Sequence, residues 1–297
     1  MQRCSHPDRP RGFPGPPRYS SCLHMMIERP AFDVDVQGID AGTAIAVRGD
    51  MDIASIESLD AALDQALAAS PRRVVLDLRG VGFVDSSGLR FLLRANARSR
   101  NEGWALEIYR PGETAIKALA VTGVLDLLPF VDAGPAVAGS PPGAEATGTA
   151  ESERTLRLEI PSTLMAPRTA RVAVKELLAD HPLAAPRVDT LTLLVSEIVT
   201  NAVTHVEPDG EGVVEFNVTV TADLTRVRVS DSGGGFAWPA ESLPKGRVGG
   251  GYGITLLDGQ ASRWGTRRMP GRFTVWFELD HLPRPADART RADAISS

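Results

Sequence analysis

The stretch SEIVTNAVTH, residues 196–205, decides the fold of the C-terminal half of this 297-residue chain. It ends a helical pattern over residues 187–205, in which Glu197, Asn201 and His205 recur every four residues and so share one helix face. The packing side of the same helix is apolar, with Leu191, Leu194, Val195, Ile198, Ala202 and Val203. Because the solvated face of an ordinary amphipathic helix also carries Glu and Asn at this spacing, the pattern gains meaning only from the motifs around it.

A second motif, RVRVSDSGGGF at residues 226–236, places an acidic side chain at the end of an alternating strand. Asp231 can accept a hydrogen bond from an amine such as the exocyclic amine of adenine, and Gly233 and Gly235 allow the backbone to approach a flat base closely. Asp-Ser-Gly-Gly is also an ordinary turn sequence, so this motif alone leaves both interpretations open.

A third motif is a glycine loop that leads directly into ITLLDGQASRWG, residues 254–265, which we expect to begin as a helix. The loop contains Gly249, Gly250, Gly251 and Gly253. Backbone N–H groups and the positive end of the helix dipole suit a phosphate at such a place. The chain contains neither the Walker pattern of P-loop proteins nor the glycine fingerprint of Rossmann folds, which excludes both kinds of nucleotide site at the level of motifs.

The chain divides into two predicted domains joined by a linker. Residues 134–154 lack apolar periodicity and are dominated by Gly, Pro, Ala, Ser, Thr and Glu, as flexible linkers are. The segments on either side, residues 31–133 and 155–280, each have the size of an ordinary domain. We expect residues 1–30 and 281–297 to be disordered tails.

Apolar patterns predict a different fold class for each domain. For the first we expect an α/β layer, a mixed sheet with packed helices, with strands at residues 32–37, 42–49, 72–78 and 104–110 and helices at 55–69, 88–103 and 112–123. For the second we expect an α+β sandwich, with strands at residues 155–160, 213–222, 226–231 and 272–279. Pro161 and Ser162 are suited to start the first helix of this second domain.

Composition excludes several classes of protein. The net charge of the chain is -5. Residues 31–133 contain 10 basic and 15 acidic side chains, and residues 155–280 contain 13 basic and 15 acidic side chains. Neither domain therefore has the basic excess that is typical of direct nucleic-acid binding. Cys4 and Cys22 lie in the N-terminal tail, where they can form neither a core disulfide nor a four-ligand zinc site. Since no apolar stretch fits a membrane span or a signal peptide, we expect a cytoplasmic protein without membrane contact.

The helix with Glu197 and Asn201, the Asp231 motif and the glycine loop occur in one order that resembles the GHKL (Bergerat) ATPases and, among them, the serine-kinase anti-sigma factors, over residues 155–280. The resemblance implies a site for ATP and Mg²⁺, in which the side-chain oxygen of Asn201 binds Mg²⁺ and Glu197 is the general base for a serine hydroxyl. Asp231 would select adenine. The glycines would shape the adenine pocket and wrap the phosphates, namely Gly233, Gly235, Gly249, Gly250, Gly251 and Gly253.

The first domain contains VGFVDSSGLRFLL, residues 81–93, between a predicted strand and a predicted helix. Asp85, Ser86 and Ser87 sit where a helix N-cap is expected, and a phosphate added there would meet helix N–H groups and the positive end of the dipole. This segment resembles the phosphorylation site of STAS-domain anti-sigma factor antagonists, and the resemblance extends over residues 31–133. It implies that Ser86 is the phosphoacceptor, with Ser87 as the alternative.

Together the two resemblances imply a partner-switching regulator of sigma factor activity. The C-terminal domain would be an ATP-dependent protein-serine kinase that phosphorylates Ser86 or the equivalent serine of a separate STAS protein, binds a sigma factor and forms a homodimer. One alternative is a non-catalytic module that binds nucleotide, with the STAS domain as a tethered partner; because a pure binding site needs no base, Glu197 argues against it. A DNA-binding regulator is a third interpretation, supported only by the basic tails.

Overall fold

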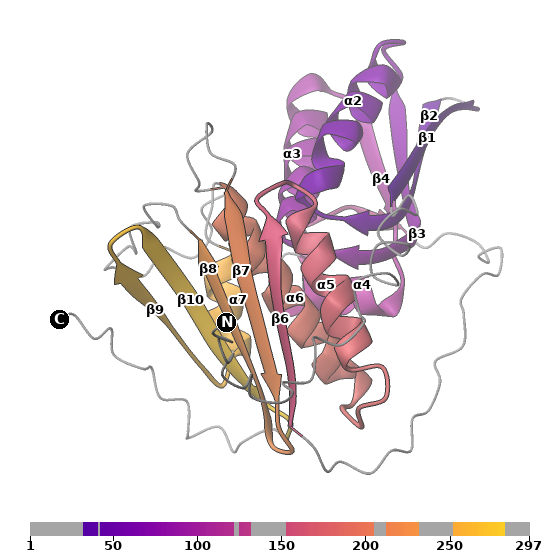
Figure 1. The fold of residues 1–297 in the computed structure, drawn as a ribbon. Coiled ribbons are helices and arrows are strands. Elements are labelled where there is room, and N and C mark those ends of the chain that lie inside the picture. The colour runs from indigo at the N-terminus through magenta and orange to yellow at the C-terminus, as the bar shows by residue number, and fades with distance from the viewer. Residues whose placement is uncertain are drawn as a thin grey trace, which may run out of the picture.

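The computed structural model of the protein describes residues 32–40, 42–121, 125–131, 153–204, 212–231 and 252–282. They form two units, each with a five-stranded sheet, and the two units lie side by side (Figure 1). The expected N-terminal tail, most of the expected linker and most of the C-terminal tail lie outside the described residues. The same is true of several predicted site residues, namely His205, Gly233, Gly235, Gly249, Gly250 and Gly251.

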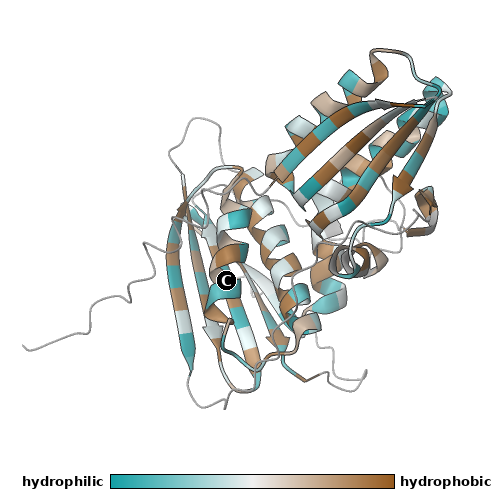
Figure 2. Cartoon of the chain, turned by 90° about the vertical axis from the view of Figure 1, so that its right-hand side faces the viewer, coloured by the Kyte–Doolittle hydropathy of each residue, from teal (hydrophilic) through white to brown (hydrophobic). Residues whose placement is uncertain are grey.

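The N-terminal unit is built on a mixed sheet, as the sequence predicts. Its strands, in the spatial order β1-β2-β3-β4-β5, are β1 (Phe32–Ile39), β2 (Gly42–Met51), β3 (Arg73–Val84), β4 (Ala105–Tyr109) and β5 (Phe130–Val131). The pair β1 and β2 is antiparallel, whereas the pairs from β2 to β5 are parallel. Hydrophobic and hydrophilic residues alternate along these strands (Figure 2), which leaves one face of the sheet apolar.

Helices pack on this sheet and build one core with it. They are α2 (Ile56–Leu67), α3 (Ser86–Glu102) and α4 (Glu113–Val121), with short 3₁₀ turns η1 (Ile53–Ser55) and η2 (Leu125–Leu127). Strand β3 runs further than the predicted strand at residues 72–78, because its alternating burial continues through the GVGFV segment. It therefore delivers the chain directly into α3, which begins at Ser86 instead of at Gly88 as predicted.

The C-terminal unit has a sheet in which every observed strand pair is antiparallel, with spatial order β6-β7-β8-β10-β9. Its strands are β6 (Arg154–Pro161), β7 (Val213–Val220), β8 (Leu224–Asp231), β9 (Arg263–Met269) and β10 (Arg272–Asp280). Its helices are α5 (Ala166–Leu177), α6 (Ala185–Thr204) and α7 (Tyr252–Gln260), and they cover one face of the sheet (Figure 1). This arrangement is the predicted α+β sandwich.

Two details of the C-terminal unit differ from the sequence-based prediction. Pro161 is the last residue of β6, paired with Val213, and α5 begins only at Ala166, with Pro167 in its first turn. Strand β9 was not predicted, because its sequence RWGTRRM has no apolar alternation and β10 is its only partner among the described strands. In the part of the chain that the structure describes, no helix is both long and apolar enough to cross a membrane.

One side chain of the N-terminal unit belongs to the core of the other. Phe83, near the end of β3, is 5% exposed and packs into the hydrophobic cluster of the C-terminal unit instead of that of its own sheet. The carboxyl end of β3 is therefore the part of the N-terminal unit that faces its neighbour.

Candidate functional site

Two residues that the sequence singled out independently are in direct contact across the boundary between the units. The hydroxyl of Ser86 donates a hydrogen bond to Oε2 of Glu197 at 2.7 Å, and the backbone N–H of Ser86 donates to Oε1 at 2.8 Å. Ser86 is 7% exposed and Glu197 is 2% exposed. The predicted acceptor hydroxyl is thus held against the predicted base, away from bulk water.

The local structure at the start of α3 explains how Ser86 is presented. Asp85 is the N-cap of α3, and its Oδ1 accepts from the N–H groups of Ser87 at 2.8 Å and Gly88 at 3.3 Å. Ser86 is the first residue of the helix, so its own N–H has no partner within α3 and is available to Glu197. A Cβ at Gly88 would lie 2.6 Å from the carbonyl oxygen of Met51, so the helix can start this close to β2 only with glycine.

A second helix end approaches the same carboxylate. A Cβ placed on Gly253, in the first turn of α7, would lie 2.5 Å from Oε2 of Glu197. The glycine therefore allows the N-terminus of α7 to pack directly against the carboxyl group of Glu197. The N-termini of α3 and α7 both meet at the Ser86–Glu197 contact, and the positive ends of both helix dipoles favour negative charge there.

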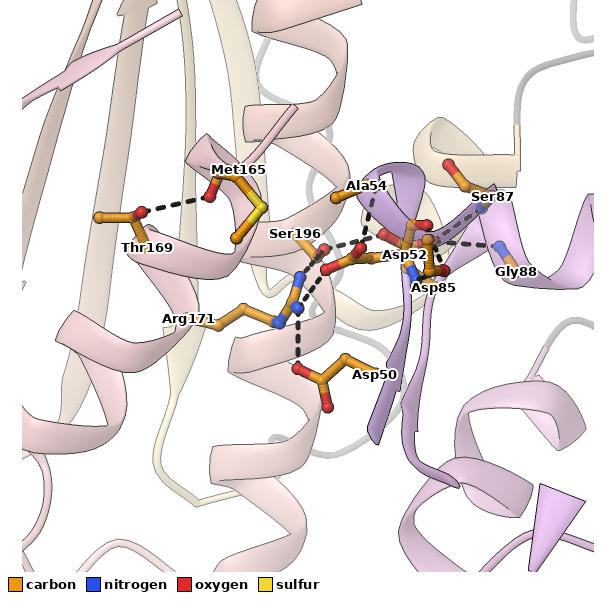
Figure 3. Close-up of polar contacts among 11 residues, drawn as sticks. Asp50, Asp52, Ala54, Asp85, Ser87, Gly88, Met165, Thr169, Arg171 and Ser196 are labelled. Carbon is orange, nitrogen blue, oxygen red and sulfur yellow. Dashed lines mark hydrogen bonds and ion pairs between the residues drawn. The ribbon is translucent and has the colours of Figure 1, made fainter. Parts of the chain in front are cut away.

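A buried arginine forms a second contact between the units (Figure 3). Arg171 of α5 is 2% exposed, and its Nη2 donates to Oδ2 of Asp50 at 2.9 Å and to Oδ2 of Asp52 at 2.5 Å. Its guanidinium also lies over the ring of Phe83, 4.3 Å from the ring centroid. Burial alone would lower the pKa of Arg171, but the two aspartates outweigh this effect and raise it, so the arginine stays charged.

The same arginine is linked to the start of α3 through a serine. Nη1 of Arg171 donates to Oγ of Ser196 at 2.9 Å, and Ser196 donates to Oδ2 of Asp85 at 3.0 Å. Ser196 is fully buried and immediately precedes Glu197. One oxygen of Asp85 therefore caps α3 while the other is bound by the C-terminal unit, which fixes the helix end opposite the carboxylate of Glu197.

Burial changes the acid–base properties of both carboxyl groups at the site. The pKa of Glu197 is raised to about 7, chiefly because burial disfavours the charged form and secondly because of the charge of Asp85, while the hydrogen bonds from Ser86 oppose the rise. Burial and the charge of Asp52 raise the pKa of Asp85 to about 6, and Arg171 opposes this. A base whose pKa lies near neutral pH, in contact with a hydroxyl, can take a proton from it.

Two of the residues predicted to hold a nucleotide, Asn201 and Asp231, lie on described elements. Asn201 is on α6, one turn after Glu197 and partly exposed, and Asp231 is the last residue of β8 and 8% exposed. Helix α6 packs against both β8 and α7, so the predicted motifs come together as far as they are described. Within the described ranges, no group of three or more His, Cys, Asp or Glu side chains is arranged to hold a metal ion. A magnesium ion here would thus depend on the amide oxygen of Asn201 and on phosphate oxygens, which fits its preference for oxygen ligands.

Sequence analysis missed the residues of the second contact: Arg171, Asp50, Asp52 and Ser196. A signal was present, because Arg171 occupies a position on the buried side of α5, four residues after Pro167 and three before Val174. A charged side chain at an apolar position of a helix needs a partner when it is buried. The sequence could not name that partner, because the aspartates lie about 120 positions away, with separations of 121 and 119 residues.

Comparison with protein families matches each unit separately. Residues 34–129 match the family described as Mlab, STAS domain, and residues 160–278 match the family described as histidine kinase-like ATPase domain. No curated protein matches the chain at a significant level.

Solved structures with similar folds cover one unit or the other. An anti-sigma factor antagonist from Mycobacterium paratuberculosis is 24% identical, with a TM-score of 0.31, over 33% of this chain and 84% of that one. The RsbU and RsbW domains of a Mycobacterium tuberculosis protein are 21% identical, with a TM-score of 0.34, over 45% of this chain and 34% of that one. A blue-light activated histidine kinase from Erythrobacter litoralis is 24% identical, with a TM-score of 0.28, over 40% of this chain and 42% of that one.

Proposed function

The chain joins a STAS domain to a histidine kinase-like ATPase domain, and we propose that it is an ATP-dependent protein-serine kinase whose substrate is Ser86 of its own STAS domain. The observation that carries this proposal is the 2.7 Å hydrogen bond from the Ser86 hydroxyl to Glu197. An acceptor hydroxyl and a base at this distance need no rearrangement for proton transfer.

The proposed reaction moves one phosphoryl group and one proton. A bond forms between Oγ of Ser86 and the γ-phosphorus of ATP, the bond from that phosphorus to the bridging oxygen breaks, and ADP leaves. Glu197 accepts the hydroxyl proton at Oε2. Asn201 would hold Mg²⁺ on the phosphates, and Asp231 would bind adenine, with the phosphates wrapped by the predicted glycine loop.

The product supplies a reason for the domains to separate. A phosphoserine carries about -1.5 to -2 charges at neutral pH. On Ser86 this charge would lie against Glu197 and near Asp85, both buried. We propose that this repulsion releases the STAS domain and exposes the face of the ATPase domain that carries Arg171, to which a sigma factor or a separate STAS antagonist would then bind. A homodimer through the ATPase domain stays a prediction.

The direct test is to incubate the purified full chain with Mg-ATP and to map phosphate by mass spectrometry. We expect phosphate on Ser86 in the wild type, none on Ser86→Ala, and retained labelling of Ser86 in Ser87→Ala as the matched control. An initial rate independent of protein concentration would identify transfer within one chain. Absence of phosphoserine from the wild type, alone and with an added STAS protein, would refute the kinase proposal, and label on Ser87 in the Ser86→Ala protein would refute the acceptor assignment.

A second candidate, a non-catalytic module with a docked STAS domain, is favoured by the ion pairs of Arg171, which hold the domains together without any reaction. In that case ATP would bind and change domain docking. Glu197→Gln would alter neither the binding of ATP nor the docking of the domains. Measuring ATP binding and phosphate transfer for this variant separates the two functions: binding retained with transfer lost supports the kinase.

A further inference from the structure

Arg90 is an arginine beside the acceptor serine that the reaction described above does not use. It follows Ser86 by four residues and Ser87 by three on helix α3, so its side chain lies on the helix face that these serines begin. Its Nη2 donates to Oγ of Ser87 at 3.2 Å. The positive charge of Arg90 also lowers the pKa of Glu197, against the larger effect of burial.

Arg90 differs from the next two arginines of α3 in having no carboxylate partner among the described residues. Arg94 donates to both oxygens of Asp60 at 2.9 Å each, and Arg98 is paired with Asp64 and Glu102. The polar contact observed for Arg90 is with a neutral hydroxyl. Its charge is therefore available to an anion.

An open groove of about 580 Å³ starts at this point on the STAS domain. It runs between α2 and α3, and its lining consists of Ile53, Ile56, Glu57, Asp60, Ser87, Arg90 and Arg94. Because Asp60 is bound by Arg94, Arg90 is the unpaired cation of the described lining, at the end next to Ser87. The groove leaves space beside Arg90 and beside Ser87, which is one residue along the helix from Ser86.

The charges that face Ser86 from the surrounding elements leave Arg90 as the suitable cation. Glu197 of α6 and Asp85 before α3 are carboxyl groups, and Glu57 of α2 lines the groove. Arg171 of α5 is already bound to two aspartates and a serine. A dianionic group among these carboxyl groups requires a positive partner, and a guanidinium binds phosphate with two parallel hydrogen bonds.

We propose that Arg90 is a phosphate-binding residue, a guanidinium supplied by the STAS domain that pairs with the phosphoryl group on Ser86 at the mouth of this groove. The proposal rests on the proposed function only in taking Ser86 as the phosphorylated residue. It adds a residue from the substrate side to a reaction in which the ATPase domain supplies the base. It also predicts that the product is held by an i, i+4 ion pair on α3 after the domains separate.

The first test does not depend on kinase activity. Phosphoserine is incorporated at position 86 of the full chain during translation. Its second pKa is measured by phosphorus NMR in the otherwise wild-type chain and in the Arg90→Ala and Arg98→Ala variants. Arg98 is the matched control, since it has the same charge on the same helix and lies about 18 Å along the helix from Ser86. We expect Arg90→Ala to raise the phosphoserine pKa by roughly half a unit or more and Arg98→Ala to leave it unchanged. The same pKa in all three backgrounds would refute the proposal.

The second test measures the rate of single-turnover transfer to Ser86. We expect Arg90→Ala to slow it by about tenfold or more, Arg90→Lys to restore part of the rate, and Arg98→Ala to match the wild type. Wild-type protein without transfer would refute the proposed kinase, while the NMR measurement would still decide the role of Arg90. Normal transfer in Arg90→Ala, together with an unchanged phosphoserine pKa, would leave the kinase standing and overturn this inference. Circular dichroism and thermal melts check that each variant folds.

Discussion

The two contacts between the domains are built from different chemistry. The acceptor contact, Ser86 with Glu197, consists of hydrogen bonds between a serine and a carboxyl group whose pKa lies near neutrality. The anchor contact joins Arg171 to Asp50 and Asp52 through buried ion pairs. One contact includes a hydroxyl proton that can move, and the other pairs a guanidinium with two carboxyl groups. The difference indicates that docking and the proposed proton transfer depend mainly on separate residues, so the proposed base can be removed while the domains stay docked.

The largest effect is expected for Glu197→Gln, which removes the proposed base and keeps the shape of the acceptor contact. Glutamine can still accept from the N–H of Ser86, so docking should persist, while phosphate transfer falls by a factor of about 10² to 10⁴. Quantitative mass spectrometry measures the transfer, and hydrogen exchange at the Ser86 amide measures the docking. Loss of amide protection in this variant would mean that the acceptor contact also holds the domains together.

The anchor contact is broken by Arg171→Ala, which leaves two aspartates without their cation. Removing one partner of a buried ion pair costs about 3–5 kcal/mol, which corresponds to a loss of docking by a factor of about 10² to 10⁴. We expect loss of amide protection at Ser86 and a wider separation of the domains in small-angle scattering. Arg157→Ala, an exposed arginine of β6, is the control and should change neither measurement. If the Arg171→Ala protein stays docked, Phe83 and the acceptor contact are sufficient to hold the two domains together.

A substitution beside the base should perturb the chemistry with little change in docking. In Gly253→Ala the new Cβ would collide with Oε2 of Glu197 at 2.5 Å, so the carboxylate must move away from Ser86. We expect transfer to slow by about tenfold, as is usual for a misplaced catalytic group. Gly259→Ala is the matched control on the same helix, because a Cβ there meets nothing within 4 Å. Equal single-turnover rates for the two variants would contradict the observed packing of α7 against Glu197.

The mildest perturbation is a change of pH. Because the pKa of Glu197 is raised to about 7, the carboxyl group gains a proton as the pH falls below 7 and can no longer accept one, so the rate should fall by up to about tenfold per pH unit. Stability changes in the opposite direction: the folded protein holds this proton more tightly than the unfolded chain, so the contribution of Glu197 decreases as the pH rises from 4.5 to 7. A transfer rate that is flat between pH 5.5 and 8 would exclude Glu197 as the titrating base.

Sequence reasoning recovered what is encoded locally. The Asp-Ser-Ser-Gly segment and the helix with Glu197 each carry their own motif, so Ser86 and Glu197 could be named from short stretches. That the two side chains touch could not be predicted, because they are 111 residues apart and the contact depends on how two folded units pack. Residue types and spacing define a site within one unit, whereas contacts between units depend on surfaces that only the fold creates.

The missed features have a common physical cause. Strand β9 is recognisable only through its partner β10, and Arg171 only through aspartates on another domain. The expected helix start at Pro161 was wrong because the same residue is acceptable at the end of an edge strand, where no ladder hydrogen bond is required of its nitrogen. In each case the local sequence is compatible with two structures, and tertiary contacts determine which of them forms.

The position of Phe83 makes separation of the domains costly in a way that charge does not describe. Its ring packs into the core of the ATPase domain and under the guanidinium of Arg171, so opening the protein brings an aromatic surface into water. Apolar surface exposed by opening favours its own covering, either by reclosure or by another protein. The open form is therefore expected to be short-lived unless a partner protein binds it. The binding of that partner, more than the separation of the two domains, would then set the duration of a signal.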